Sequence, residues 1–414
     1  KGPEFLSVHN ARWVDSTLQT MTLDQKIGQL LMPRGNNSGR GYDPQKLLNW
    51  VKNYHLGGIV FFAGQPSVQA RMTNELQAAS KIPMLIGEDL EWGLAMRLDS
   101  TVRFPYQMTL GAMPRNEALI EAMGREIGRQ CKRMGVHVNY APVVDINNNP
   151  NNPVINFRSF GEDKYNVTSK ALAYMRGMQS QRILASAKHF PGHGDTGVDS
   201  HYDLPLINKS KQQLQELELY PYQELIKNGL SGIMTAHLSI PALDSTKNLA
   251  STLSSRIVTD LLRKDLGFQG LVFTDAMDMQ GAVKYYPNGE ALVKAVLAGN
   301  ELIETFEDVP AAFTAIKKAV TEGMIKEADL NQRVRRILMA KSWVGLDKYQ
   351  PIVLQNLVQD LNTIESDVLN RQMAEAALTL IKNQDEILPI RDLTQKIAVV
   401  SIDASQTTTF QKMA

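Results

Sequence analysis

Cysteine is nearly absent from this sequence, since Cys131 is the only one among 414 residues. A single thiol excludes an intrachain disulfide and a zinc site built from several cysteines. Cys131 falls within a helical pattern, and we interpret it as a buried, inert thiol, because free cysteine usually behaves as a small hydrophobic residue. Long apolar runs are also lacking, and none reaches the roughly 20 residues that a membrane-spanning helix needs. Internal repeats and low-complexity segments are absent as well.

Neither sign of charge is in excess, because 44 lysines and arginines face 43 aspartates and glutamates. Without a long basic stretch, nothing favours a nucleic acid or an anionic membrane as a partner. The content of 43% hydrophobic and 21% charged residues is typical of a folded globular protein. The chain begins at Lys1 without a hydrophobic signal region, so we expect a processed or trimmed protein. It would be periplasmic or secreted if a signal peptide has been removed, and otherwise cytoplasmic.

Short β-rich segments alternate with amphipathic helical stretches over most of the chain. The expected strands are Gly28–Met32, Gly58–Phe62, Met84–Gly87, Val136–Tyr140, Ile183–Ala187, Gly232–Thr235, Leu271–Thr274 and Glu301–Ile303. The expected helices are Gln65–Ser80, Asn116–Met134, Lys164–Gln181, Lys211–Asn228, Ser254–Leu266, Gly289–Ala298 and Pro310–Glu322. This alternation predicts right-handed parallel β–α–β units, and eight of them close into a (β/α)8 barrel over residues 1–345. An open doubly wound sheet is the alternative, but no glycine-rich phosphate loop follows the first strand.

The pattern changes after residue 345. Residues 346–370 are polar and helical without a clear strand, and we interpret them as a linker helix region. A further helix is expected over Arg371–Ile381, and Ile397–Ile402 has the pattern of a buried strand. Residues 371–414 therefore look like the beginning of a second α/β domain, which we expect to be truncated here or to continue in a larger protein.

The active sites of (β/α)8 barrels lie at the C-terminal ends of the strands. Titratable side chains follow nearly every expected strand, beginning with the third: Glu88, Asp89 and Glu91, then Asp145, Lys188 and His189, His237, Asp275 and Asp278, and Glu304. Five of the seven histidines lie in or just after strands: His137, His189, His193, His201 and His237. This distribution favours an enzyme without indicating which one.

The segment from Lys188 to His201 is the densest in chemically active groups, with three histidines and two aspartates among glycines and a proline. Such a backbone can fold tightly and approach a ligand closely. The residues alone leave three interpretations open. His189, His193, Asp195 or His201 could bind a metal, the histidines could satisfy carbonyl groups of a structural turn, or Asp199 could orient His201 and raise its pKa for acid/base catalysis.

Asp275 ends the apolar strand Leu271–Thr274 abruptly. Aspartate is unfavourable in strand interiors, so a carboxylate at a strand tip calls for an explanation. It could cap the helix that follows. Alternatively, it could point into the mouth of the barrel as a nucleophile or metal ligand.

These segments together resemble glycoside hydrolase family 3, in its bacterial β-N-acetylglucosaminidase branch. The resemblance rests on KHFPGHGDTGVDSH (188–201), FTDAM (273–277), GEDLEWGLAMRL (87–98), NPVINFRSFGED (152–163) and LSSRIVTDLLRKDLGFQGLVFTD (253–275). It spans the whole expected barrel, and the region from about residue 370 resembles the start of the family's α/β sandwich domain. KHFPGHGDT is a long, ungapped and chemically unusual string, so we regard this match as highly specific.

The resemblance implies a role for each matching residue. Asp275 matches the catalytic nucleophile, His201 the acid/base of this branch and Asp199 the dyad partner of that histidine. The residues that match sugar-binding positions are Asp89, Arg97, Arg158, Lys188 and His189. One position departs from the family pattern, since Trp92 stands where a glycine usually follows the glutamate. Its indole could stack on a sugar or be a buried structural ring.

The resemblance further implies a retaining glycosidase that forms a covalent glycosyl-enzyme and needs neither cofactor nor metal. Its substrate would be a small carbohydrate with a β-linked terminal N-acetylglucosamine (GlcNAc), from muropeptides, chitin oligosaccharides or host glycans. Four alternatives stay open: a family 3 β-glucosidase or xylosidase, a GlcNAc phosphorylase, a metal-dependent barrel hydrolase, and a sugar-binding barrel without turnover.

Overall fold

The computed structural model describes residues 2–36, 39, 42–114, 116–287, 289–305, 308–392, 394, 396, 398–402 and 406–413. The chain forms two compact units, Lys1–Ala377 and Leu378–Ala414. The first unit contains one sheet of eight strands, whose bounds are β1 Leu31–Gly35, β2 Gly58–Phe61, β3 Leu85–Glu88, β4 Val138–Asn139, β5 Leu184–Phe190, β6 Gly232–Thr235, β7 Leu271–Thr274 and β8 Ile303–Thr305.

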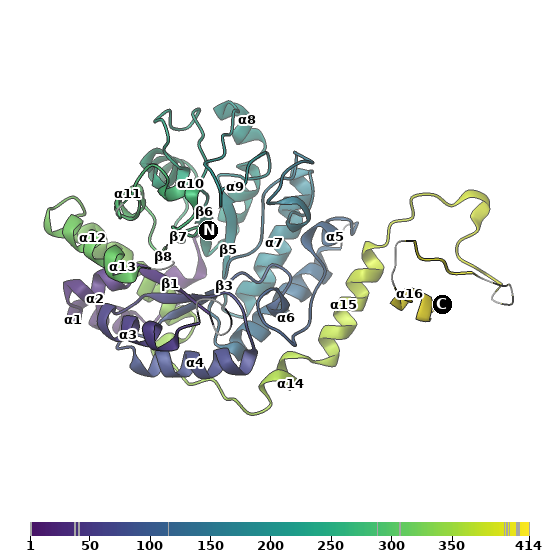
Figure 1. Ribbon diagram of the computed structural model, residues 1–414, viewed down its shortest axis with the longest axis horizontal. Helices are drawn as coiled ribbons and strands as arrows, with labels where there is room; N and C mark the ends of the chain where they lie inside the picture. Colours follow the sequence, from purple (N-terminus) through teal and green to yellow (C-terminus); the bar gives the residue numbers. More distant parts are fainter. Residues whose placement is uncertain are drawn as a thin grey trace. The chain divides into compact units, whose positions relative to one another are not determined.

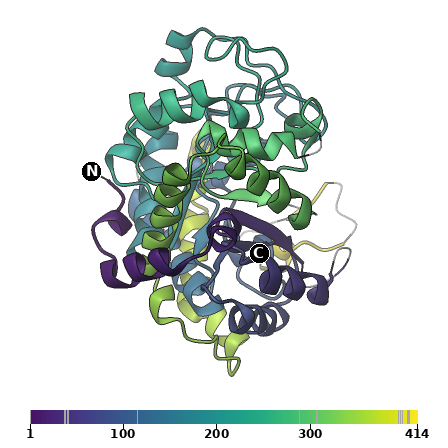
Figure 2. The ribbon, with the colours of Figure 1, turned by 90° about the vertical axis from the view of Figure 1, so that its left-hand side faces the viewer.

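The strands form a closed ring. Every neighbouring pair is parallel, in the order β7-β6-β5-β4-β3-β2-β1-β8. Leu302, directly before β8, pairs with Phe273 of β7 in a single parallel bridge, which brings the two ends of the sheet together. The helices surround these strands (Figures 1 and 2). The prediction of a (β/α)8 barrel is therefore confirmed, and the C-terminal ends of all eight strands face one side.

The helices of the first unit cover most of the expected positions and add several that the sequence pattern did not indicate. They are α1 Ala11–Thr20, α2 Leu23–Gly28, α3 Pro44–Tyr54, α4 Pro66–Ala79, α5 Gln107–Gly111, α6 Glu117–Met134, α7 Lys164–Ser180, α8 Lys211–Glu216, α9 Tyr220–Lys227, α10 Gln280–Val283, α11 Glu290–Ala298, α12 Val309–Thr321, α13 Glu327–Trp343, α14 Leu357–Leu361 and α15 Ile364–Ala377. Arg256–Asp265 is a π-helix. No helix within the described ranges is long and apolar enough to cross a bilayer.

Local signals explain where the elements differ from the prediction. The capping box of Thr22 and Gln25 starts α2 over residues 23–28, so β1 begins three residues later than expected. The expected helix Lys211–Asn228 is divided into α8 and α9, and Pro221 stands at the start of α9, where its missing N–H does no harm. Strand β5 continues to Phe190, so Lys188 and His189 lie within the strand rather than after it.

The barrel interior is packed with apolar side chains below the strand ends. The rings of Tyr140 and Phe273 meet edge to face with their centroids 5.4 Å apart. Gly87 leaves room for the tyrosine, because a Cβ atom there would lie 2.8 Å from its Oη. Met32 is also buried in this region. The barrel interior is therefore a packed apolar core, and the polar groups at the C-terminal strand ends lie above it.

The segment 346–370 contacts the barrel. Arg133 of α6 donates from Nε to Oδ2 of Asp360 at 2.9 Å, and Ser366 donates to Glu126 of α6 at 2.7 Å. Helix α15 begins before the expected helix Arg371–Ile381 and ends at Ala377. In the second unit, α16 covers Thr409–Met413. Residues 398–402 form no strand, contrary to prediction, and Ile397 lies outside the described residues. A second α/β domain over residues 371–414 stays a prediction.

Candidate active site

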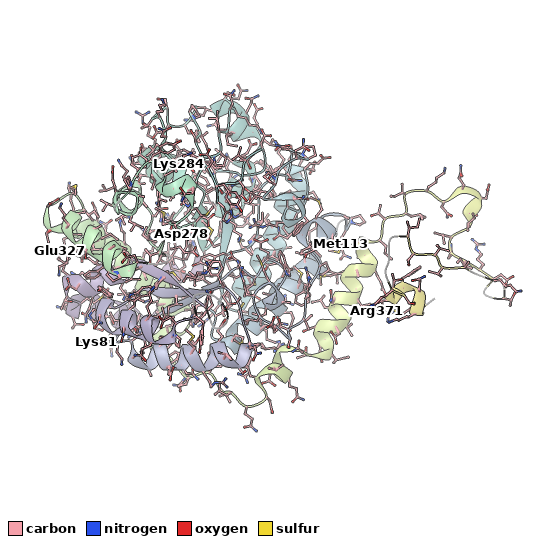
Figure 3. All side chains as sticks on the ribbon, in the orientation of Figure 1. Lys81, Met113, Asp278, Lys284, Glu327 and Arg371 are labelled. Carbon is pink, nitrogen blue, oxygen red and sulfur yellow. The ribbon has the colours of Figure 1, made fainter. Side chains whose placement is uncertain are left out.

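A polar cavity of about 550 Å³ opens at the C-terminal ends of the barrel strands. Seven of the eight residues predicted from the sequence line it: Asp89, Arg97, Arg158, Lys188, His189, His201 and Asp275. The eighth, Asp199, is hydrogen-bonded to His201. Asp278, which is labelled in Figure 3, follows the end of β7 by four residues and also lines the cavity. The structure thus brings the predicted site residues together around one space.

Asp275 follows β7 directly. Its amide donates to the carbonyl oxygen of Thr235 in β6 at 3.0 Å, and its Oδ1 accepts from the amide of Ala276 at 2.8 Å. Burial alone would raise the pKa of Asp275, but His189, His237 and the Ala276 amide hold it below its ordinary value. The carboxyl group is therefore ionised at neutral pH. Asp275 does not cap a helix at once, because α10 begins five residues later, at Gln280.

His201 and Asp199 form a hydrogen-bonded pair on the long loop after β5. Nδ1 of His201 lies 2.6 Å from Oδ1 of Asp199, which also accepts from the His201 amide at 2.9 Å. Burial would raise the pKa of Asp199, but these two bonds lower it. The imidazole is 59% exposed, and none of the described residues hydrogen-bonds its Nε2. The pair therefore fixes Nδ1 and leaves Nε2 without a hydrogen bond from the described residues.

The β5 loop rests on the segment that follows β7. The carbonyl oxygen of His201 accepts from the amide of Gln280 at 3.5 Å, and that of Ser200 accepts from Gly281 at 3.2 Å. A Cβ atom at Gly281 would lie only 3.0 Å from the Ser200 oxygen, so glycine permits this approach. These contacts tie the loop that carries His201 to the loop that carries Asp275.

Five charged side chains form an alternating chain along one wall of the cavity. Lys188 donates to Asp89 at 2.7 Å and approaches Glu91 at 2.9 Å. Arg97 pairs with Asp89 at one end, and Arg158 binds both carboxylate oxygens of Glu91 at the other, at 2.7 and 3.1 Å. Burial would raise the pKa of Glu91, but Arg158 and Lys188 lower it to about 2. The wall is therefore ionised and held together by charge-assisted hydrogen bonds.

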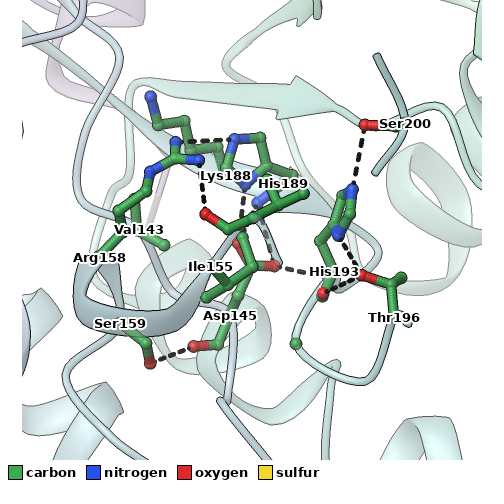
Figure 4. Close-up of polar contacts among 12 residues, drawn as sticks. Val143, Asp145, Ile155, Arg158, Ser159, Lys188, His189, His193, Thr196 and Ser200 are labelled. Carbon is green, nitrogen blue, oxygen red and sulfur yellow. Dashed lines mark hydrogen bonds and ion pairs between the residues drawn. The ribbon is translucent and has the colours of Figure 1, made fainter. Parts of the chain in front are cut away.

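Asp145 is the buried anchor of the β5 segment (Figure 4). Its carboxylate accepts from the amides of His189 and His193, at 3.2 and 2.6 Å, and from Nδ1 of His189 at 2.7 Å. Burial would raise the pKa of Asp145, but His189 and these amide bonds lower it. The bond to Nδ1 directs the other nitrogen of His189 toward Arg158, 3.4 Å away. Asp145 therefore fixes the orientation of a residue that lines the cavity.

His193 has a structural role in this loop. Its Nδ1 lies 2.7 Å from Oγ1 of Thr196 and its Nε2 lies 3.1 Å from Oγ of Ser200 (Figure 4). Burial and the nearby His189 lower the pKa of His193 to about 4, so the ring is neutral at pH 7. Of the interpretations of this segment, the structural turn therefore applies to His193. In the part of the chain that the structure describes, no three histidine, cysteine, aspartate or glutamate side chains are arranged to hold a metal ion.

His237 supports the loop that carries Asp275. Its Nε2 donates to the carbonyl oxygen of Ala276 at 3.0 Å, and its Nδ1 lies 3.0 Å from Oγ1 of Thr252. Two other residues of the sequence pattern point elsewhere. Glu88 pairs with Gln69 of α4, and His137 lines a separate cavity of about 700 Å³ with Arg133.

Four site residues were left without a role by the sequence pattern: Glu91, Asp145, His237 and Glu304. Each was noted after a strand, which is the only signal that could have found it, but partners distant in sequence decide its function. Glu304 differs from the others, because it is 5% exposed, lines the cavity and has no hydrogen bond from the described residues to its carboxyl group.

Comparisons with known proteins agree with this architecture. The chain is 33% identical to "Beta-hexosaminidase A" of Pseudoalteromonas piscicida over 430 residues, covering 92% of this chain and 71% of that protein. Among solved structures, a family 3 β-N-acetylglucosaminidase from Paenibacillus sp. str. FPU-7 superposes with a TM-score of 0.81 at 36% identity, covering 89% of this chain and 71% of the other. "Beta-glucoside phosphorylase BglX" bound to 2FGlc gives a TM-score of 0.83 at 27% identity, covering 94% and 72%.

The family model "Glycosyl hydrolase family 3 N terminal domain" matches residues 22–340. This range contains the whole barrel and every residue of the cavity. The match covers well over half of the chain and agrees with the strings quoted from the β3, β5 and β7 regions. The chain therefore belongs to glycoside hydrolase family 3.

Proposed function

We propose that the protein is a retaining exo-β-N-acetylglucosaminidase that hydrolyses terminal β-linked GlcNAc. One observation carries the proposal: an ionised Asp275 and the Asp199–His201 pair line or adjoin one cavity at the C-terminal end of the barrel. A retaining glycosidase needs a nucleophile on one side of the anomeric carbon and a proton donor near the leaving oxygen. These are the two roles that the pair of loops can supply.

In the first step, Asp275 attacks the anomeric carbon and forms a glycosyl-aspartate while the aglycone oxygen leaves. Its lowered pKa keeps it unprotonated and ready to attack at neutral pH. His201 gives its proton to the departing oxygen from Nε2, which no described residue hydrogen-bonds. Asp199 holds Nδ1 at 2.6 Å and stabilises the imidazolium before that transfer.

In the second step, neutral His201 takes a proton from water, and the resulting hydroxide displaces Asp275 from the sugar. An imidazole can serve as an acid in one step and as a base in the next near neutrality. We assign sugar binding to Asp89, Arg97, Arg158, Lys188 and His189, which carry their polar atoms on one wall of the cavity. The fixed charges of that wall would orient the ring hydroxyl groups for attack.

The preference for an N-acetylated sugar is supported by the names of similar proteins. Beta-hexosaminidase A and the Paenibacillus β-N-acetylglucosaminidase both exceed 30% identity to this chain. The direct test compares 4-nitrophenyl β-N-acetylglucosaminide with the corresponding glucoside and xyloside. We expect the first to be cleaved with a much higher kcat/KM, and Asp275→Ala to lose several orders of magnitude of turnover. Preferred cleavage of the glucoside would reject the N-acetyl assignment, and full activity of Asp275→Ala would reject the mechanism.

Phosphorolysis is a second candidate. It is favoured by the β-glucoside phosphorylase among the similar structures. A neutral imidazole repels an anionic acceptor less than a carboxylate base would, so phosphate can compete with water at the glycosyl-enzyme. Product analysis in phosphate buffer distinguishes the two reactions. Free sugar alone supports hydrolysis, whereas sugar 1-phosphate supports phosphorolysis.

We also propose a biological setting and a domain plan. The substrates would be muropeptides or chitin oligosaccharides, consistent with cell-wall recycling. Residues 371–414 would begin an α/β sandwich domain, as the sequence of that region resembles. Assays on isolated cell-wall fragments and on chitobiose test the first point, and the structure of a longer chain tests the second.

A further inference from the structure

Glu304 of β8 presents a polar group to the active-site cavity that no described residue engages. Both of its main-chain groups are hydrogen-bonded. The amide donates to Oγ1 of Thr274 at 2.9 Å, and the carbonyl oxygen accepts from the amide of Met277 at 3.0 Å. The side chain is only 5% exposed, and what is exposed lines the cavity. Glu304 is therefore fixed at its backbone while its carboxyl group faces the space that a ligand would fill.

No described residue hydrogen-bonds the Glu304 carboxyl group, although the charges of Lys188 and Arg97 act on it. Its register partner in β1 is Met32, which is 1% exposed, and Tyr140 and Phe273 fill the barrel interior nearby. Buried polar groups in native proteins almost always have a hydrogen-bond partner. An unpartnered one at the edge of a ligand cavity points to a group of the ligand as the missing partner.

Glu304 differs chemically from the charged wall. Burial raises the pKa of Glu304 well above its ordinary value, and the carboxylates of Asp89 and Asp275 raise it further. These effects favour the protonated carboxylic acid, which offers one O–H donor and a carbonyl acceptor. In that form the group adds no negative charge next to Asp275 and can both donate to and accept from a ligand.

The order of the strands separates Glu304 from that wall. β3 and β7 lie four strands apart in the ring, so the line between Asp89 and Asp275 divides the site into two sides. β4 and β5, with Lys188 and the loop that carries Arg158, lie on one side, and β8 lies on the other. Arg158 and Lys188 offer only N–H donors, which suit a carbonyl such as that of an acetamido group. A hydroxyl group both donates and accepts, and it suits the carboxylic acid on the other side.

We propose that Glu304 binds the C6 hydroxyl group of the sugar that Asp275 attacks. This inference rests on the proposed function, in which the anomeric carbon lies at Asp275. The end of the sugar ring opposite the anomeric carbon then faces Asp89. C2 with its acetamido group and C5 with its hydroxymethyl group therefore fall on different sides of the line between Asp275 and Asp89. The side with the N–H donors of Lys188 and Arg158 takes the acetamido group, and Glu304 takes the hydroxymethyl group. Glu304 is in this way a specificity-determining residue.

The test measures kcat/KM for 4-nitrophenyl β-N-acetylglucosaminide and for its 6-deoxy analogue. The wild-type enzyme should prefer the 6-hydroxyl substrate by about 10-fold or more, because a site built for a hydroxyl rejects the analogue that lacks it. Glu304→Gln keeps a donor and an acceptor and should keep most of this preference. Glu304→Leu and Glu304→Met have neither, so both should bring the ratio of the two kcat/KM values close to one.

The ratio separates binding from a purely structural role, because a folding defect lowers both values together. Equal cleavage of both substrates by the wild type would overturn the proposal, as would an unchanged ratio in the folded leucine or methionine variant. Thermal unfolding identifies which variants are folded. If the wild type cleaves only the glucoside, the N-acetyl assignment fails, and the ratio is measured on the glucoside and its 6-deoxy analogue instead. Turnover of neither family of substrates would overturn both proposals.

Discussion

The buried ion pair between Glu91 and Arg158 should contribute strongly to stability, and Glu91→Gln tests this. The Glu91 side chain is 0% exposed, accepts two bonds from Arg158 at 2.7 and 3.1 Å and lies 2.9 Å from Nζ of Lys188. Glutamine keeps the volume, so the substitution removes the charge without opening a cavity. Arg158 then loses the carboxylate that it binds directly, which costs about 3–5 kcal/mol in comparable pairs. Because glutamine retains one acceptor oxygen, we expect the free energy of unfolding to fall by about 3 kcal/mol, at the lower end of this range.

Urea unfolding at pH 7 measures this loss as a shift of the midpoint at constant slope. The loss should persist in 1 M salt, because a buried pair is screened far less than an exposed one. Asp260→Asn is the matched control, since Asp260 pairs with Lys264 at 2.7 Å with side chains 52% and 69% exposed. An exposed pair of this kind is worth less than about 1 kcal/mol.

The difference in free energy of unfolding between the wild type and Glu91→Gln depends on pH, and the sign of this dependence is defined. The pKa of Glu91 is lowered to about 2 in the folded protein, against about 4.3 in an unfolded chain. Its stabilisation is therefore present above pH of about 4 and is lost as the pH falls toward about 2. The double variant Glu91→Gln/Arg158→Met leaves no unpaired charge at this position and should regain part of the loss. A single-variant loss below about 1 kcal/mol, or a double variant no more stable than Glu91→Gln, would refute the reasoning.

Three further outcomes follow from the site and the fold. His201→Ala should slow the cleavage of methyl β-N-acetylglucosaminide far more than that of the activated 4-nitrophenyl glycoside, and an equal loss of kcat/KM on both would remove its role as acid. Activity after exhaustive dialysis against EDTA should match that of untreated enzyme, whereas a loss restored by added metal would revive the metal-dependent alternative. Burial lowers the pKa of Lys341 to about 7, so the unfolded chain binds more protons between pH of about 7 and 10 and stability rises with pH there. The free energy of unfolding of wild type minus that of Lys341→Met should therefore increase across this range, and a constant difference would mean that Lys341 titrates normally.

The barrel could be predicted because its signals are local. Each strand is a short, fully buried apolar run such as Leu271–Thr274, and each is separated from the next by an amphipathic helix. Boundaries were less predictable where neighbouring signals compete. The capping box of Thr22 shortens the expected first strand from its beginning, and hydrogen bonding to β6 carries β5 two residues past its polar Lys188. Such effects depend on tertiary contacts that a sequence window does not contain.

The candidate site could be predicted to the extent that its residues fall in unusual strings. Asp275 and His201 stand in such strings, and both line the cavity. Asp145 could not be given a role, because its three partner atoms belong to His189 and His193, more than forty residues away. Glu304 was still less accessible to sequence reasoning, because its importance lies in having no partner among the described residues, which only the three-dimensional arrangement reveals.

The seat of the β5 loop on α10 gives the enzyme a mechanical property. Gly281 leaves no spare room, since a Cβ atom there would lie 3.0–3.1 Å from oxygen atoms of Ser200 and Asp203 and from the Cβ of His237. A single added methyl group would force the His201 loop, α10 or His237 to shift by a few tenths of an ångström, while the side chains of His201 and Asp275 stay chemically intact. The packing of the β5 loop on α10 thus depends on a position that belongs to neither of these two residues.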